Sequence, residues 1–293
     1  PSLKGIDGAS GNFRLSTPFF GTILGMLTKT GFRSLLLLTT IAISLLGCAG
    51  FTGNSIENEA GQAFNVDQLP AQEDLPKFSA DRPRNGMPDG WHFYRIAPYK
   101  KNTIYRLENY QGRTVLAANS KTSASGLAVK LRPRSAQNLW LQWEWKAVAA
   151  IPNADNAESQ QDDAPLRILV AFDGNKSKLP LKEKLTFEMA SLISGQEMPY
   201  ATVMYVWSGK NPVNTLLNNA HTSRVKMIVV DSGLNNLGEW RKHERDLAAD
   251  YKLAYGEAPG NVIGIALLTD TDNTKSETRA LYGDIELVRK NLK

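Results

Sequence analysis

The sequence predicts a mainly β protein, with one β-sandwich domain and two α-helices inserted between its strands. Short apolar runs of strand length, separated by turn residues, recur along most of the chain. One run alternates apolar and polar residues, and two segments have a helical period. Many short strands at this spacing are typical of a sandwich or a barrel. The predicted strands are residues 91–96, 103–108, 113–118, 127–131, 139–148, 166–172, 200–207, 225–230, 262–268 and 281–288.

The first 47 residues have the features of a signal for export. Residues 1–25 have no helical or strand period, and we interpret them as an overextended reading frame, because Met26 would begin a signal of ordinary length. Lys29 and Arg33 precede the uncharged run LLLLTTIAISLL at 35–46, which is shorter than the roughly 20 apolar residues of a transmembrane helix. We therefore interpret residues 26–47 as a signal peptide.

Cys48 is the only cysteine of the chain and directly follows this run. The residues LLGC that end at Cys48 resemble a bacterial lipobox, in which the cysteine is diacylated and becomes the new N-terminus. The alternative is a buried helix with an incidental cysteine. Ala49 follows, rather than the aspartate that retains many enteric lipoproteins at the inner membrane. The sequence thus predicts an outer-membrane lipoprotein that faces the periplasm, with the membrane as a partner through Cys48.

Composition excludes several classes of protein. A hydrophobic content of 42% excludes a disordered chain, and one cysteine excludes a disulfide scaffold or a thiolate metal site. Residues 1–47 carry four basic residues and one acidic residue, so their removal lowers the net charge from +5 to +2. Because no basic stripe with interleaved aromatic residues remains, we expect no nucleic-acid partner.

The remaining chain divides into a tether and one domain. Residues 48–90 contain four prolines and no sustained period, which predicts a tether and an arm. Residues 91–293 form the predicted sandwich domain. Within it, residues 182–192 are weakly amphipathic and end near Gly195, whereas residues 239–255 end at Gly256, so both read as helices. Neither helix can build a separate core.

The strand LWLQWEWKAV at 139–148 shows the clearest period of two. Its odd-numbered residues are apolar, whereas the opposite face carries mostly polar groups. One face is therefore predicted to enter the core and the other to meet solvent or a ligand. The second face consists of Trp140, Gln142, Glu144 and Lys146.

The densest polar cluster is the segment TDTDNT at 269–274, directly after the apolar run VIGIALL. Asp270, Asp272 and Asn273 present oxygen atoms of the kind that Ca²⁺ prefers. The spacing departs from an EF-hand, since Lys275 stands where that motif has glycine and Leu281 where it has glutamate. The alternative is an Asx-rich turn closed by its own hydrogen bonds, and we favour the turn.

Arg167 lies within the apolar run LRILVAF, which follows Asp162 and Asp163. A buried guanidinium needs a carboxylate partner, and we expect Asp163, Asp270 or Asp272 to supply it. We favour a structural ion pair. The alternative is catalysis, because paired carboxylates perform acid and base chemistry in glycoside cleavage; the candidate catalytic residues are Asp163, Arg167, Asp270 and Asp272.

Aromatic residues offer a further candidate site. Tyr205 and Trp207 share one strand face and, with Trp140, would form a platform for sugar rings; the alternative is that they belong to the core.

The three histidines lack helical ligand spacing, which disfavours a zinc site. Serine-hydrolase, P-loop and dinucleotide motifs do not occur in the sequence.

Several segments in order resemble the bacterial domain of unknown function 3047. They are WLQWEWKA, DDAPLRILVAF, YVWSG, RDLAADY, LTDTDNT and ALYGDIEL, and the resemblance as a whole covers approximately residues 91–288. The resemblance brings no activity or catalytic residues with it. The ending YGDIELV is also similar to the last strand of jelly-roll carbohydrate-binding modules, which implies a jelly-roll or galactose-binding-like sandwich.

These observations predict a lipid-anchored sandwich without catalytic activity that binds a glycan or another component of the cell envelope. The predicted ligand surface consists of Trp140, Tyr205, Trp207, Asp270, Asp272 and Asn273. No cofactor is expected, with Ca²⁺ at the acidic loop as the one candidate. The alternatives are a jelly-roll glycoside hydrolase or polysaccharide lyase, and an envelope scaffold whose partners are proteins.

Overall fold

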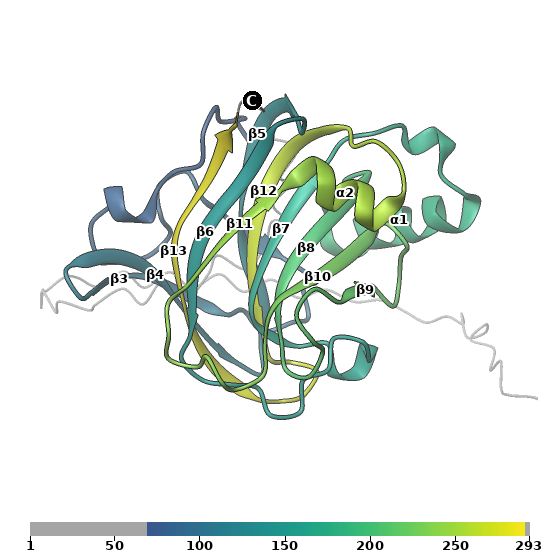
Figure 1. The fold of residues 1–293 in the computed structure, drawn as a ribbon. Coiled ribbons are helices and arrows are strands. Elements are labelled where there is room, and N and C mark those ends of the chain that lie inside the picture. The colour runs from purple at the N-terminus through teal and green to yellow at the C-terminus, as the bar shows by residue number, and fades with distance from the viewer. Residues whose placement is uncertain (1–68, 291–293) are drawn as a thin grey trace, which may run out of the picture. The chain divides into compact units, whose positions relative to one another are not determined.

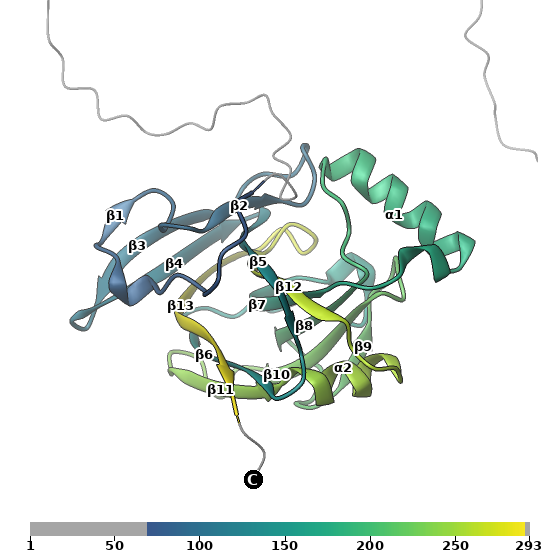
Figure 2. The same ribbon diagram turned by 90° about the horizontal axis from the view of Figure 1, so that it is seen from above.

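The structure is a computed structural model that describes residues 69–290, and it shows two β-sheets packed face to face (Figures 1 and 2). One sheet has six strands in the order β1-β3-β4-β13-β6-β11, and the other has seven in the order β2-β5-β12-β7-β8-β10-β9. The mainly β jelly-roll sandwich with two inserted helices is thus confirmed. The predictions for residues 1–68, including Cys48, lie outside the described residues.

The strands of the six-stranded sheet come from both ends of the described chain. They are β1 (Arg84–Asn85), β3 (Ile104–Tyr110), β4 (Arg113–Lys121), β13 (Glu277–Arg289), β6 (Leu139–Ala147) and β11 (Arg241–Asp246). All neighbours in this sheet are antiparallel. The long strand β13 therefore joins the hairpin β3–β4 to the alternating strand β6.

The seven-stranded sheet contains one parallel pair among its described strands. Its members are β2 (His92–Arg95), β5 (Ala124–Ser135), β12 (Asn261–Asp270), β7 (Ala164–Phe172), β8 (Ala201–Ser208), β10 (Val225–Ser232) and β9 (Leu216–Asn218). Strands β8 and β10 are parallel, because the connection between them, which includes β9, returns the chain to the starting end. Each predicted strand coincides with an observed one, whereas β1, β9 and β11 were not predicted.

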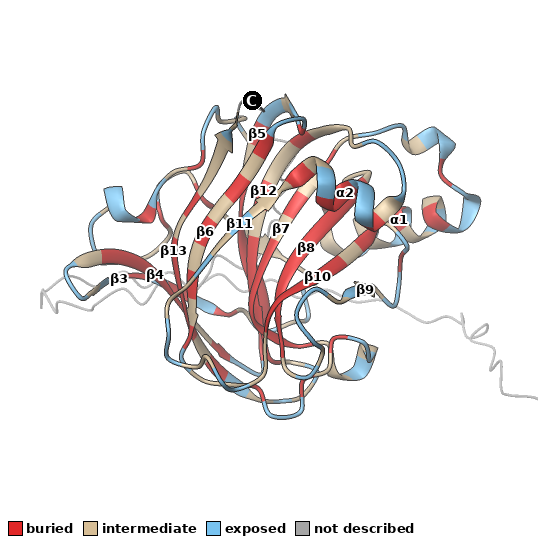
Figure 3. Ribbon diagram, in the orientation of Figure 1, coloured by how far each residue is buried: buried red, intermediate tan, exposed pale blue. Residues whose placement is uncertain are grey.

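The core lies between the sheets, where the strands carry most of their buried residues (Figure 3), and it combines aliphatic with aromatic side chains. The odd-numbered residues of β6 are buried and the even-numbered ones are half-buried, as the alternation predicts. The ring of Trp143 packs against those of Trp145 and Tyr205, with centroids 5.4 and 5.0 Å apart. Such pairs of rings bury a large apolar area and stabilise the contact between the sheets.

The helices differ in how closely they join this core. Helix α2 (Leu247–Tyr255) begins at Asp246, whose carboxylate accepts hydrogen bonds from the backbone N–H groups of Ala248 and Ala249 at 3.0 and 3.1 Å. It buries Leu247 and Tyr251. Helix α1 (Leu181–Ser194) extends along the outside of the molecule in both views (Figures 1 and 2). Short 3₁₀ helices occur at Phe78–Ala80 (η2), Ser159–Gln161 (η3) and Lys176–Lys178 (η4).

The predicted start of the second helix at residue 239 is wrong. Residues 241–246 form the edge strand β11, paired with β6. The strand turns His243 inward, where its Nε2 lies 2.7 Å from a carboxylate oxygen of Asp231. Arg245 also turns inward and bonds Asp250 of α2 with its Nε at 2.8 Å. These long-range partners decide the local structure, because intrinsic helix propensity is a weak preference.

The predicted arm is partly built into the folded domain. Backbone groups of Gln72 pair with those of Lys130 and Arg132 in β5 at 2.9 and 3.0 Å. The buried ring of Phe78 lies 5.1 Å from that of Trp91. Packing therefore begins before residue 91. Within the described residues, no helix combines the length and the apolar character that crossing a bilayer requires.

Candidate functional site

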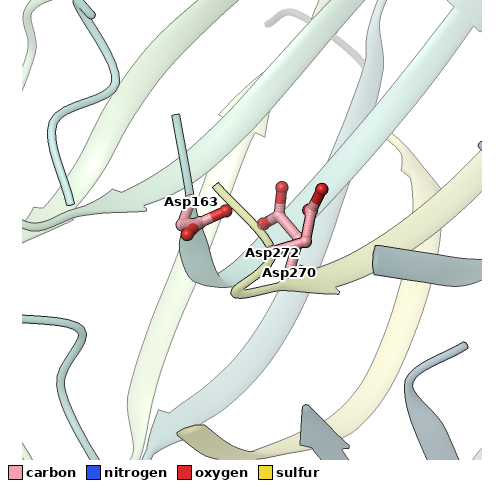
Figure 4. A group of neighbouring side chains, drawn as sticks. All are labelled: Asp163, Asp270 and Asp272. Carbon is pink, nitrogen blue, oxygen red and sulfur yellow. The ribbon is translucent and has the colours of Figure 1, made fainter. Parts of the chain in front are cut away.

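The structure brings the predicted acidic residues together at one end of the sandwich. Asp163 directly precedes β7, and Asp270 ends the neighbouring strand β12, where it pairs with Ala164. Asp272 lies two residues further along. One carboxylate oxygen of each aspartate lies within 4.8 Å of those of the other two (Figure 4). The pairing of β7 with β12 therefore creates the cluster.

The predicted ion pair of Arg167 forms within this cluster. Its Nε donates to Oδ1 of Asp270 at 3.0 Å, and its Nη2 donates to Oδ2 of Asp270 at 3.2 Å and to Oδ1 of Asp162 at 3.0 Å. The guanidinium also lies against the sulfur atoms of Met204 and Met227. Asp163, one of the expected partners, contributes no direct bond to Arg167 among these contacts. A planar guanidinium can bind two carboxylates at once, which explains why the chain has arginine here.

The other two aspartates close the turn after β12. Asp163 accepts hydrogen bonds from the N–H groups of Asn273 and Thr274 at 3.2 and 2.7 Å and from the Thr274 hydroxyl at 2.6 Å. Asp272 pairs with Nζ of Lys100 at 2.5 Å. The side chain of Asn273 donates to a backbone carbonyl instead of forming a ligand surface. This arrangement matches the Asx-rich turn that we favoured.

Burial controls the protonation of this cluster. Desolvation raises the pKa of Asp270 to about 7, although the charge of Arg167 acts in the opposite direction. Desolvation alone would lower the pKa of Arg167. The charges of Asp162 and Asp270 outweigh this effect, so the pKa of Arg167 lies above its usual value. Arg167 therefore stays charged while Asp270 titrates.

The cluster is closed to large ligands. Asp163, Arg167 and Asp270 are 0%, 2% and 6% exposed. Asp163, Asp270 and Asp272 are the described residues whose spacing would suit a cation, but Arg167 and Lys100 already place positive charges against them. Since a substrate would need access to these groups, the structure does not support the four predicted catalytic residues as an active site.

The predicted aromatic platform is wrong. Tyr205 is fully buried and donates to Asp250 at 2.8 Å, and Trp207 is 2% exposed and donates to the carbonyl of Gly233 at 3.1 Å. Both residues belong to the core between the sheets, and the other face of β8 is also buried, in a second apolar cluster that includes Met198 and Leu217. Trp140 alone of the three points away from the core.

Sequence reasoning missed a more open site on the outside of the six-stranded sheet. We call this surface the outer face. It holds a depression of about 470 Å³ on the side of β6 that faces away from the core. Its charged and polar lining residues are Arg113, Gln142, Glu144, Lys242, His243, Glu244, Asp284 and Glu286.

A glycine in β13 makes room for one end of the outer face. The pairing of β13 with β6 shifts between Tyr282 and Ile285, and the carboxylate of Glu144 lies over Gly283 there. A Cβ atom at Gly283 would lie 2.5 Å from Cγ of Glu144. Such irregular pairing often occurs beside functional sites, where it redirects side chains.

Arg113 joins this glutamate to an aromatic pair. Its guanidinium forms a salt bridge with Glu144 and lies 4.2 Å above the ring of Trp240. The ring of Tyr110 meets Trp240 edge to face, with centroids 5.9 Å apart. These contacts hold the planar groups at this end in fixed orientations.

The other end of the outer face has a similar composition. Glu244 accepts hydrogen bonds from Gln142 and from Lys290, and these bonds lower the pKa of Glu244. Nζ of Lys290 also lies 4.3 Å above the ring of Trp140. Arg113 and Lys290 thus each connect a tryptophan ring to a glutamate that lines the depression.

Part of this face was visible in the sequence. The alternation in 139–148 identified the outward row that contains Trp140, Gln142 and Glu144. Lys242 and Glu244 escaped notice, because their segment was predicted as a helix and no local signal showed its pairing with β6.

Several solved structures are distantly similar to this chain. The structure of endoglucanase 3 from Trichoderma harzianum, of family GH12, is similar with a TM-score of 0.38 and 7% identity, over 71% of this chain and 94% of that chain. A family 12 xyloglucanase from Bacillus licheniformis has a TM-score of 0.38 and 6% identity, over 74% and 99%. An exo-β-agarase has a TM-score of 0.32 and 14% identity, over 76% of this chain, which spans 25% of the agarase. These likenesses concern the fold alone.

The amino-acid sequence shows which family the chain belongs to. No curated protein matches the chain. A family model described as "Protein of unknown function (DUF3047)" matches residues 89–286, which is more than half of the chain and includes both sheets. The chain therefore belongs to the DUF3047 family.

Proposed function

We propose that this protein is a lipid-anchored, periplasm-facing sandwich whose outer face binds a glycan of the cell envelope. The observation that carries the proposal is the depression of about 470 Å³ with a lining of charged and amide side chains. Two of its lining residues connect it to tryptophan rings, because Arg113 lies over Trp240 and Glu244 bonds Lys290, which lies over Trp140. Ligand sites combine apolar or aromatic surface with a few fixed polar groups. The outer face has both.

The chemistry of the lining suits a neutral, hydroxyl-rich ligand. Carboxylates such as Glu144 and Glu244 accept hydrogen bonds from hydroxyl groups, and Arg113, Gln142 and Lys242 donate them. Both signs of charge occur, so the face does not select for a strongly charged ligand. From Trp140 to Glu144, which both point away from the core, the strand rises by roughly 13 Å, which gives an extended ligand several places to bind.

Binding fits this face better than hydrolysis does. A glycoside hydrolase needs a carboxylic acid with a raised pKa to protonate the leaving group. The pKa of Glu244 is lowered instead, Glu144 is paired with Arg113, and Glu286 is paired with Lys77 at 2.9 Å. The hydrogen bonds from Lys290 and Gln142 thus favour the ionised form of Glu244, which accepts hydrogen bonds and cannot protonate a leaving group.

A glycan array and a pull-down with peptidoglycan test the proposal. The sample is residues 48–293 with Cys48→Ser, which contain every described residue and exclude the predicted signal. We expect binding, and we expect Gln142→Ala combined with Lys242→Ala to weaken it about tenfold or more. A lost neutral hydrogen bond from Gln142 contributes about 0.5–1.5 kcal/mol, and one from the charged Lys242 contributes about 1.5–3 kcal/mol.

Lys252→Ala is the matched control, because Lys252 is exposed on α2 and does not line the depression. This variant should bind as the parent protein does. Binding that survives the double substitution unchanged, or a parent protein that captures neither glycan nor peptidoglycan, would contradict the proposal. Crosslinking of Lys242 to an envelope protein in intact cells would instead support the scaffold alternative.

A further inference from the structure

Helix α1 turns its apolar residues toward solvent. Leu181, Leu185, Met189, Leu192 and Ile193 are 71%, 52%, 58%, 81% and 46% exposed. Their spacing of three or four residues places them in one row along the helix. We call these five residues the leucine row. An isolated exposed leucine is ordinary, but a continuous row of this kind marks a surface that meets an apolar partner.

The opposite side of α1 already attaches the helix to the domain. Glu183 is buried and accepts hydrogen bonds from the Thr222 hydroxyl at 2.5 Å and from the N–H of Ser223 at 3.0 Å. Desolvation would raise the pKa of Glu183, but these bonds lower it, so the group stays ionised. Phe187 is buried on the same side. The leucine row is therefore not used by the fold of the described residues.

Lysine side chains surround the N-terminal half of the row. Lys176, Lys178, Lys182 and Lys184 lie in η4 or in the first turns of α1. Lys176 pairs with Glu197, whereas Lys178, Lys182 and Lys184 form no salt bridge with a described carboxylate. A depression of about 600 Å³ runs along this part of the helix and is lined by Leu181, Lys182, Leu185, Thr186, Met189 and His221.

We infer that α1 is an interfacial helix that lays the leucine row on an anionic lipid surface. The acyl region of a bilayer would cover the leucines, and lipid phosphates would neutralise the lysines beside them. A second copy whose α1 packed parallel to this one would bring three lysines against their counterparts, which repel one another, whereas lipid phosphates would neutralise them in any orientation. The combination of row and lysines thus favours lipid over self-association.

Membrane contact by α1 does not require the predicted lipid anchor, but the anchor would support it. Cys48 precedes the first described residue, Leu69, by 21 residues, which reach at most about 75 Å when fully extended. An acylated Cys48 would therefore keep α1 within reach of the membrane, where a weak helix contact gains from the high local concentration.

Vesicle sedimentation tests this inference with residues 48–293 carrying Cys48→Ser, so that no acyl chain contributes. We expect binding to vesicles of three parts phosphatidylethanolamine to one part phosphatidylglycerol. Leu185→Gln combined with Leu192→Gln should weaken binding about tenfold or more, because both side chains lose their place in the apolar region. Lys178→Gln combined with Lys182→Gln should weaken binding to these vesicles and should not affect binding to neutral vesicles.

Leu253→Gln is the matched control, because Leu253 is 61% exposed on α2 and lies outside the row. It should bind vesicles as the parent protein does. A parent protein that stays in solution, or a Leu185→Gln and Leu192→Gln variant that still sediments fully, would overturn the inference. A dimer in analytical ultracentrifugation that these substitutions dissociate would also overturn it, since a second copy would then cover the row. Glycan binding by the outer face should not change in these variants, so the two proposals fail independently.

Discussion

Arg167 and Asp270 show how a single pair of side chains decides the structure at one end of the sandwich. Both are almost fully buried, and the guanidinium bonds two carboxylates. Breaking such a pair on one side typically costs about 3–5 kcal/mol, because the other charge remains buried without a partner. The cluster thus holds β7, β12 and the turn after β12 in one arrangement.

The raised pKa of Asp270 predicts a specific pH dependence. Folding raises this pKa to about 7, so the native state keeps a proton that the unfolded state loses near pH 4. The resulting contribution to stability is complete at low pH and is lost as pH rises toward 7. We expect the stability difference between the parent protein and Asp270→Asn to shrink, by at most about 4 kcal/mol, from pH 4 to pH 7.

Urea unfolding at several pH values measures this difference. Other titrating groups, such as Asp231, occur in both proteins and cancel in the comparison. Asp173→Asn is a useful control, because its carboxylate lies in another part of the sheet and bonds Asn261. A difference that stays constant or grows across this range would refute the predicted titration.

Two strands contain a glycine at a point where a neighbouring group lies close to the backbone. Gly126 in β5 and Gly283 in β13 both lie where a neighbour approaches the backbone. At Gly126 the neighbour is the carbonyl oxygen of Leu267, which would lie 2.1 Å from an added Cβ. At Gly283 it is the side chain of Glu144, which can rotate away.

These two glycines are predicted to respond differently to alanine. Gly126→Ala should destabilise the protein by about 3 kcal/mol or more, because a backbone carbonyl of the sheet must move. Gly283→Ala should cost about 1 kcal/mol and weaken ligand binding at the outer face, because Glu144 leaves its position beside Arg113. Thermal unfolding together with the glycan-binding assay separates the two effects. Equal losses of stability in both variants would show that the contacts at these glycines are not those of the structure.

The molecule as a whole presents two separate surfaces, the outer face on the six-stranded sheet and the leucine row on α1. The first suits a glycan and the second a lipid surface. A lipid anchor at Cys48 would hold both in the same compartment. Anchoring would thus explain why one molecule carries both surfaces, which share no lining residue among those described.

Acylation of Cys48 can be measured directly in cells that express the full chain. Metabolic labelling with palmitate should label the parent protein, and Cys48→Ser should abolish the label and release the protein from the membrane fraction, because two acyl chains are needed for stable anchoring. Cys48 is the only cysteine in the sequence, so no other thiol of this chain can carry the label. An equal label on both proteins would contradict the anchor.

The sequence by itself determined the sandwich class, the faces of β6 and the need of Arg167 for a carboxylate, because these follow from a period of two and from the cost of an unpaired buried charge. It did not determine that Asp162 and Asp270, rather than Asp163, bind Arg167. That choice depends on the register between β7 and β12.

Only the tertiary structure decided which surfaces are open. Tyr205 and Trp207 are buried although their strand pattern suits a platform, because their face of β8 packs into the core against the six-stranded sheet. Lys242 and Glu244 reach the outer face because β11 pairs with β6 instead of continuing α2. Local periodicity shows which residues share a face, but only the packing of distant segments decides what covers that face.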